Sequence, residues 1–496
     1  MIRYCPIACT AAALLTSCAA GPNFRPPEPP HTSGFLPPGQ LAAETASAPA
    51  PAGEAQRFVE GLDIPGQWWT LFQSPQLNAL IERGLANSPT LEAATAALRQ
   101  ANETLAAGRG SFFPSVSAAA GVQRDKEPGI AVGAPQIGSV LYTLNSATVN
   151  VSYTVDAFGG VRRQVEALGA QAEYQKFALE AAYLTLSANI VTGAIAESSL
   201  RAQIRATQEI AASQQKQLDI TQRRLNAGGA SKVDVLQQQA FLQTTLASLP
   251  PLRTQLAQQR NLLAAYVGEL PADYTGPDFT LESLSIPTEL PVSLPSKFVE
   301  QRPAVQEYSA LLHEATAEIG VATANMLPQI TLSGSYGGEA ESFANVFSPA
   351  SVIWSVAASL TQPLFKGGQL THQRRAAIAA AQQAAANYRA TVITAFENVA
   401  DTLYALQGDA DALAAETLAE STAAASLQLV QVQYTSGAAN YLQVLTAEQT
   451  YQNAAVALVK ARAQRYADTA ALFQALGGGW WNRSDVTANS SDQGKR

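Results

Sequence analysis

Few residues in this chain of 496 have the types and spacing that enzyme chemistry needs. The three histidines, His31, His313 and His372, lie far apart and lack the spacing of metal ligands. A solvated or packed imidazole is therefore the expected state of each. No nucleophile elbow, phosphate-binding loop or dinucleotide fingerprint occurs. We accordingly expect no enzyme, no metal site and no cofactor apart from a covalent lipid.

One cysteine has a context that predicts chemical modification. Residues 1–17 contain one positive residue, then a short apolar run and small residues, which is typical of a secretory signal. The signal ends in Leu15-Thr16-Ser17-Cys18. This run resembles the bacterial lipobox, in which cleavage precedes a cysteine that becomes lipid-modified. An ordinary signal peptide that happens to contain a cysteine is the alternative. Ala19 favours delivery to the outer membrane.

Composition narrows the class of protein further. Apolar residues make up 47% of the chain and charged residues 14%, against about 25% charged in typical soluble proteins. The net charge of −8 includes no basic block, so nothing indicates nucleic-acid binding. No apolar stretch of about 18 residues follows the N-terminus. The chain is thus either a large helical assembly or a protein that meets a membrane through β-strands, whose sequence signal is weak.

The body of the chain contains the same plan twice. The stretch Asn226–Leu236 (NAGGASKVDVL) corresponds to Thr435–Leu445 (TSGAANYLQVL), with the first glycines 209 residues apart. Two pairs of prolines, Pro89 with Pro303 and Pro114 with Pro328, are each separated by 214 residues. Pro89 and Pro303 each suit the first turn of a helix, and Pro114 and Pro328 each end one.

Alternating apolar and polar residues follow each closing proline, which predicts β-strands. We expect two strands in the first repeat, near 115–124 and 146–157, and two in the second, near 329–338 and 351–362. Each strand is about ten residues long, which is enough to cross a bilayer at a tilt.

Very long helices are predicted after the second strand of each repeat. They cover 161–226 and 369–436, reverse at the glycine motif and return over 231–267 and 439–476. A cytosolic coiled coil is the alternative, but a strict heptad pattern is not sustained and strands interrupt the helices.

Four strands per chain cannot close a membrane barrel, which needs at least about eight. An open sheet in lipid would leave backbone groups unpaired. Several chains must therefore assemble, and two, three or four copies would give eight, twelve or sixteen strands. The strand count does not choose among them.

With these features together, the chain resembles the TolC-type outer-membrane factors, most closely the OprM/NodT-like branch of efflux lipoproteins. The resemblance covers nearly the whole chain and is carried by five motifs: LTSCAAGPNFRPP (Leu15–Pro27), WWTLF (Trp68–Phe72), VDAFGGVRR (Val155–Arg163), QPLFKGG (Gln362–Gly368) and QYTSGAANYLQVLTAE (Gln433–Glu448).

The resemblance implies a mixed α and β fold in which a homotrimer forms a transmembrane β-barrel and a long periplasmic α-helical barrel. It implies the exit duct of a tripartite efflux pump for drugs or other small molecules, in the bacterial outer membrane. A periplasmic adaptor and an inner-membrane transporter, expected to be of the RND type, would be its partners. The exported substrate is not predicted.

Domain boundaries follow from the repeats and from this resemblance. We expect, in order, a signal peptide at 1–17, a lipidated tether at 18–57, a first repeat at 58–270, an equatorial linker at 271–295, a second repeat at 296–479 and a C-terminal tail at 480–496.

The resemblance places the glycine motifs at the periplasmic tips, where a gate is expected. Family members often line it with a leucine and an acidic residue four positions later. Leu442 matches the leucine, but Thr446 stands where the acid is expected. Asp234 is a candidate for charge near the tip instead. Helix packing for Leu442 and a helix cap for Asp234 are the alternatives.

Adaptor contact is expected close to the same turns. The candidates are Arg224, Leu225 and Gly228 in the first repeat, and Tyr434 and Gly437 in the second. Plain packing at the helix ends would explain these residues equally well. For the whole chain, a periplasmic coiled-coil adaptor or structural lipoprotein is the alternative function.

Overall fold

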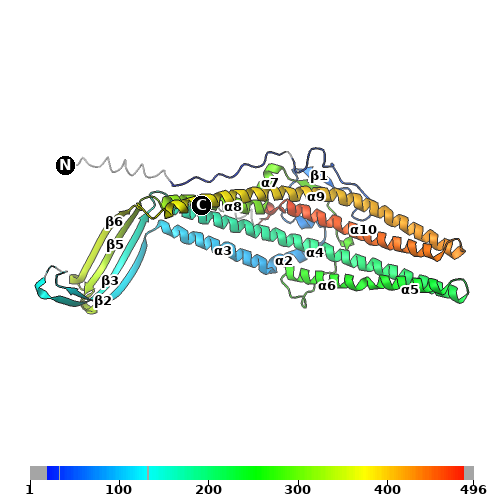
Figure 1. Ribbon diagram of the computed structural model, residues 1–496, viewed down its shortest axis with the longest axis horizontal. Helices are drawn as coiled ribbons and strands as arrows, with labels where there is room; N and C mark the ends of the chain where they lie inside the picture. The colour runs from blue at the N-terminus through cyan, green and yellow to red at the C-terminus, as the bar shows by residue number, and fades with distance from the viewer. Residues whose placement is uncertain (1–18, 33, 131–132, 134, 485–496) are drawn as a thin grey trace. The chain divides into compact units, whose positions relative to one another are not determined.

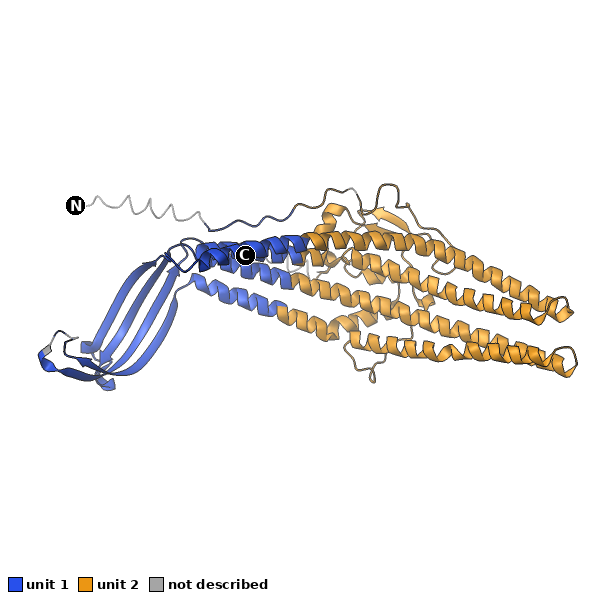
Figure 2. Ribbon diagram, viewed as in Figure 1, with its two compact units in different colours: residues 1–27, 98–175, 308–388 blue, residues 28–97, 176–307, 389–496 orange. Residues whose placement is uncertain are grey.

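The computed structural model describes residues 19–32, 34–130, 133 and 135–484. The expected signal peptide, Cys18 and the tail after residue 484 lie outside the described residues. The chain divides into two compact units (Figure 2). One unit comprises residues 1–27, 98–175 and 308–388, and the other comprises 28–97, 176–307 and 389–496.

The first unit contains a four-stranded antiparallel sheet (Figure 1). Its strands follow the order β2 (Ser115–Pro128), β3 (Ser139–Val155), β5 (Gln329–Ala340) and β6 (Val352–Thr361). The first two strands belong to the first repeat and the last two to the second. Pairing of β3 with β5 therefore joins the repeats in one sheet.

The first two strands extend beyond the predicted limits of 124 and 146. The segment 123–128 of β2 pairs with 139–144 of β3, whereas pairing of β3 with β5 begins only at Asn145. A two-stranded ribbon thus continues past the edge of the other two strands. The alternation of apolar residues weakens in this ribbon, which includes Arg124, Asp125 and Lys126. The strands predicted from that alternation were therefore too short.

Two helix pairs follow the proline and glycine signals of the repeats. The shorter helices are α3 (Pro89–Arg109) and α8 (Pro303–Ala324), each beginning at its proline. The longer ones are α4 (Gly160–Asn226), of 67 residues, and α9 (Gln369–Ser436), of 68 residues. Both long helices run from one compact unit into the other.

The returning helices differ between the repeats, and the prediction of one helix over 231–267 was wrong. This segment forms α5 (Lys232–Ala247) and α6 (Leu249–Tyr266), separated at Ser248. Pro250 and Pro251 lack an N–H and cannot bond to the preceding turn, which explains the break. The second repeat has no proline there, and α10 (Tyr441–Ala475) continues for 35 residues.

One described helix, α4, is long and apolar enough to cross a membrane by length and composition alone. Its most apolar window has a mean hydropathy of 1.3, and 56% of that window is buried inside the protein. Ile190, Val191 and Ala194 are fully enclosed. These three apolar residues therefore serve packing within the second unit.

The second unit has an aromatic core and a small sheet that the sequence patterns did not reveal. Strand β1 (Arg57–Glu60) pairs in parallel with β4 (Glu289–Val292), so the end of the tether joins the linker. The short helices α2 (Pro75–Asn87) and α7 (Pro295–Gln301) complete this unit. Trp68, in the 3-10 helix Trp68–Phe72, stacks on Phe473 with ring centroids 5.5 Å apart.

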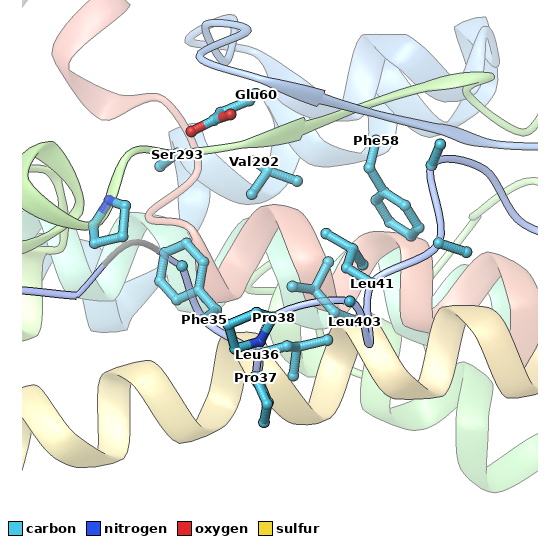
Figure 3. Close-up of a pocket in the computed structure, with 15 residues that line it drawn as sticks. Phe35, Leu36, Pro37, Pro38, Leu41, Phe58, Glu60, Val292, Ser293 and Leu403 are labelled. Atoms are coloured by element: carbon cyan, nitrogen blue, oxygen red, sulfur yellow. The ribbon is translucent and has the colours of Figure 1, made fainter.

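A cavity of about 380 Å³ lies under the tether in the same unit (Figure 3). Phe35, Leu36 and Leu41 of the tether line it, together with Phe58 of β1 and Leu403 of α9. Glu60 is the acidic residue among its lining residues. The lining shows that the proline-rich tether, although irregular, is packed against the helices of this unit.

Candidate functional site: a two-faced sheet and paired hairpin turns

The sheet of the first unit presents an exposed apolar face. Trp354 and Val356 of β6 are 73% and 80% exposed, and Leu360 points the same way by alternation. Trp354 lies opposite Tyr336 of β5, which in turn lies opposite Val149 of β3. A continuous band of large apolar side chains therefore crosses the strands. A sheet face of this kind suits contact with the hydrocarbon core of a membrane.

The opposite face of the same sheet is polar. Asn150 of β3 lies opposite Ser335 of β5, and Ser335 lies opposite Ser355 of β6. The two serine hydroxyls are hydrogen-bonded at 2.8 Å. Ser117 of β2 continues the row beyond Asn150. This arrangement, apolar on one side and hydroxyl-rich on the other, is that of a wall between lipid and water.

The residues after the predicted cleavage site are held firmly in the first unit. The Ala20 N–H donates to the Phe158 carbonyl at 2.8 Å. The Arg163 guanidinium donates to the Ala20 carbonyl at 3.1 Å and to Asn23 Oδ1 at 2.6 Å. Gly21 passes so close to the Gly320 backbone that a Cβ on it would lie 2.5 Å from the Gly320 Cα. These contacts fix the start of the tether in one position. We call the site formed by Phe158, Arg163 and Gly320 the seat of the tether.

His313 belongs to this seat and is a packed histidine, as expected. Its ring stacks on Phe24 with centroids 4.3 Å apart, and its Nε2 lies 3.0 Å from Glu166 Oε1. Burial by itself would raise the pKa of Glu166, but hydrogen bonds from Arg163 and His313 outweigh it and lower that pKa. Among the described residues, no group of three or more His, Cys, Asp or Glu side chains could hold a metal ion.

The two glycine turns have the same backbone structure. Gly228 and Gly437 have φ angles of 77° and 80°, in the left-handed region that glycine adopts readily. After each, an N–H bonds back across the helix end, from Gly229 to the Arg224 carbonyl and from Ala438 to the Gln433 carbonyl, both at 2.8 Å. Both bonds close a Schellman motif, which ends α4 and α9 in the same way.

The helices that leave these turns begin with the same motif but with different side chains. Ser231 and Asp234 form a reciprocal capping box at the start of α5, with bonds of 3.1 Å and 2.8 Å. Asn440 and Gln443 form the equivalent box at the start of α10. Asp234 is therefore a helix cap, the alternative considered for it, and its neutral counterpart in the second repeat is Gln443.

Two of the three candidate gate residues, Leu442 and Thr446, lie on one exposed face of α10, whereas Asp234 lies on α5. Leu442 is 65% exposed in the single chain, and the Thr446 hydroxyl donates to the Leu442 carbonyl at 2.9 Å. Val233 occupies the equivalent position at the start of α5 and is 60% exposed. Both turns thus carry an exposed apolar residue two positions after the cap.

Two of the adaptor-contact candidates contact each other. The Arg224 guanidinium lies over the Tyr434 ring, 4.3 Å from its centroid, and donates to the Tyr434 carbonyl at 3.2 Å. Burial raises the pKa of Tyr434, and Asp234 adds to the rise while Arg224 opposes it. Leu225 is half-buried, whereas Gly228 and Gly437 are exposed. Arg224 and Tyr434 therefore connect the two turns within one chain.

A buried polar layer next to the turns was missed by sequence reasoning. The Tyr441 hydroxyl donates to Gln238 Oε1, and the Thr245 hydroxyl donates to Gln452 Oε1 at 3.4 Å, so α10 is bonded to α5. Glu448, two turns after Tyr441, is almost fully buried. The seven-residue spacing of Tyr441 and Glu448 was an available signal that both lie on the packed face of α10.

Comparison with known proteins assigns the chain to a family. The profile of the outer membrane efflux protein family matches residues 80–269 and 294–478, one segment in each repeat. The pyoverdine export outer membrane protein OpmQ of Pseudomonas aeruginosa is 29% identical over 84% of this chain and 87% of its own length. The probable efflux pump outer membrane protein TtgC of Pseudomonas putida is 27% identical over 95% of both chains.

Solved structures agree with this assignment. The structure of the outer-membrane channel OprN superposes with a TM-score of 0.84 at 26% identity, covering 93% of this chain and all of that one. The Vibrio cholerae outer membrane protein VceC gives a TM-score of 0.78 at 26% identity, covering 84% of this chain and all of VceC.

The fold and the two-faced sheet define an outer-membrane channel with long helical extensions. The chain belongs to the outer membrane efflux protein family, as a TolC-like channel component of an efflux pump. The family and fold predicted from the sequence motifs are thereby confirmed.

Loss of the Arg224 side chain should loosen the link between the two turns. We expect Arg224→Ala to lower the stability of the turn at 434–440 by about 1–2 kcal/mol, because a stacked cation and a charged hydrogen bond are lost. Hydrogen–deuterium exchange of the amides at 434–440 measures this as faster exchange. Arg224→Lys should recover little, since a lysine cannot stack as a planar fork.

The neighbouring arginine provides a matched control for this experiment. Arg223 is exposed and donates only to the Asp219 carbonyl of its own helix, at 3.3 Å. Arg223→Ala should leave exchange at 434–440 unchanged. Equal effects of the two substitutions would contradict the assigned role of Arg224.

Proposed function

We propose that three copies of this chain assemble into a passive exit duct of a tripartite efflux pump. The observation that carries the proposal is the four-stranded sheet with one apolar and one hydroxyl-rich face. Three such sheets would supply twelve strands, enough to close a barrel with a watery interior. The long helices α4 and α9, with their returning helices, would continue the duct into the periplasm.

Unpaired sheet edges support assembly of several copies. Among the strands that the structure describes, β2 and β6 each pair on one side only. In a bilayer, the free N–H and C=O groups of both edges would lack water as a partner. Pairing of β6 in one copy with β2 in the next satisfies both edges at once and closes the ring.

The paired turns are the proposed periplasmic end of the duct. Exposed apolar residues beside them, including Val233, Leu236 and Leu442, suit contact with other helices, either of neighbouring copies or of an adaptor. In this proposal the adaptor links the duct to an energy-supplying inner-membrane transporter of the RND type. Selection of the exported molecule then lies mainly with the transporter, because a wide duct makes few specific contacts.

The N-terminus is proposed to carry a lipid on Cys18. Support comes from the lipobox-like run in the sequence and from the seat that holds Ala20, Gly21 and Asn23 in the sheet-bearing unit. That seat would keep an acylated Cys18 close to the unit that enters the bilayer.

Metabolic labelling tests the lipid directly. We expect cells given radioactive palmitate to label the protein, and Cys18→Ser to abolish the label, because the thiol is the acceptor. Cys9→Ser, inside the predicted signal, should still be labelled. Label that persists in Cys18→Ser would contradict the proposal.

Assembly and conduction test the duct itself. The purified protein should migrate as a trimer without heating and as a monomer after boiling, because the closed barrel resists detergent. In planar lipid bilayers it should conduct ions. A periplasmic structural lipoprotein would show neither property and would be open to protease along its whole length.

The gate proposal assigns the narrowest constriction to Leu442, with Thr446 beside it and without a ring of carboxylates. We expect Leu442→Ser to raise the single-channel conductance by about twofold or more, since a polar ring wets more readily than an apolar one. Val233→Ser, at the equivalent position of the first repeat, is the matched control and should have little effect. Unchanged conductance in Leu442→Ser, or an equal rise in both variants, would refute the assignment.

A further inference from the structure

A carboxyl group is enclosed between the two hairpins without a partner. Glu448 on α10 is 4% exposed, and neither of its carboxylate oxygens receives a hydrogen bond. Burying an ionised carboxylate without a partner is costly, so such a group tends to take up a proton instead.

One neighbouring amide is already engaged with other groups, and a second one is buried without partners. Gln238 on α5 is fully buried; its Nε2 donates to the Gln214 carbonyl at 3.1 Å, and its Oε1 accepts from the Tyr441 hydroxyl. Gln238 lowers the pKa of Glu448, but burial outweighs this effect. The side chain of Gln214 on α4 is 1% exposed, and both its Nε2 and its Oε1 lack partners. The layer thus contains an unpaired donor and an unpaired acceptor on Gln214 in addition to the carboxyl of Glu448.

The charged and titratable groups nearby provide no counterion for Glu448. Arg224 on α4 is engaged with Tyr434 of α9, and Asp234 on α5 caps its helix. On α10 itself, the negative charge of a deprotonated Glu448 would raise the pKa of Tyr441 further. One turn along, burial raises the pKa of Tyr451, and the carboxylates of Glu420 on α9 and Glu209 on α4 add to the rise. The surroundings therefore favour the neutral carboxyl.

We propose that Glu448 is a proton-binding site and that the bound proton fastens α10 to the α4–α5 hairpin. A protonated carboxyl is both donor and acceptor, so it suits a layer that already holds unpaired amide groups. All the groups concerned belong to one chain. The inference therefore goes beyond the duct proposed above and does not depend on the number of copies in the assembly.

The direction of the pH effect follows from the burial of this group. Burial raises the pKa of Glu448 from the ordinary 4.5 to about 7. The packed state therefore binds the proton more tightly than an opened state in which the carboxyl meets water. Its stabilising contribution is complete below pH 4.5 and is lost as the pH rises through about 7. The ratio of packed to opened helix should fall by roughly 70-fold between pH 5 and pH 8.

Hydrogen–deuterium exchange of the full-length protein in lipid nanodiscs tests this inference. Protection factors, which divide the intrinsic exchange rate of each amide at the same pH by its observed rate, report the opening equilibrium directly. We expect the protection of 441–452 and 232–245 to fall as the pH rises from 5 to 8. Glu448→Gln keeps the length of the side chain and removes its charge. In this variant the protection of both segments should stay at its low-pH value from pH 5 to pH 8.

A matched variant and a second measurement complete the test. Glu209→Gln removes an exposed carboxylate from α4 and should keep the wild-type pH dependence. Infrared spectra should contain a protonated carboxyl band that disappears near pH 7 and is missing in Glu448→Gln. Protection that does not depend on pH in the wild type, a pH dependence that persists in Glu448→Gln, or ionisation near pH 4.5 would overturn the proposal.

Discussion

The backbone of a sheet in hydrocarbon must have every N–H and C=O paired, and the rest of this structure depends on that constraint. The four strands pair with one another, yet β2 and β6 leave one edge each unpaired. No rearrangement within a four-stranded chain can satisfy both edges and leave room for a channel. The membrane environment also explains the two faces of the sheet, because the apolar face meets lipid and the polar face meets a watery interior.

The sheet is built from the two copies of an internally duplicated sequence. Each repeat contributes one antiparallel strand pair and one long helical hairpin, and the β3–β5 pairing joins the two copies. The turns of the two hairpins share their left-handed glycine and their capping box. Backbone geometry at the turns is therefore common to both repeats, while side chains at equivalent positions, such as Asp234 and Gln443, have diverged.

The sheet and the hairpin turns differ in how completely their polar groups are satisfied. In the sheet, a regular ladder pairs the backbone, and Ser335 with Ser355 shows that side chains pair as well. Near the turns, Arg224 and Tyr434 form a defined link, but Glu448 and the Gln214 amide are buried without partners. A layer of that kind responds to protonation, whereas the sheet does not.

The amino-acid sequence by itself determined the elements whose causes are local. Glycine and proline placed the helix ends, and period-two alternation located the four strands of the sheet, although β3 begins seven residues before the predicted start at 146. Both signals depend on neighbouring residues only. It also determined the class of the protein through the order of its motifs. The break at Ser248 could have been predicted from Pro250 and Pro251, whereas β1–β4 pairing joins short segments more than two hundred residues apart and had no periodic signal.

Only the tertiary structure decided which side chains share an environment. It brought Arg224 to Tyr434, seated the start of the tether at Arg163, and enclosed Glu448 beside Gln238. Each of these contacts joins residues from helices or segments far apart in the chain. The physical reason is that burial and pairing depend on how whole helices pack, and a residue's own neighbours in sequence do not specify that packing.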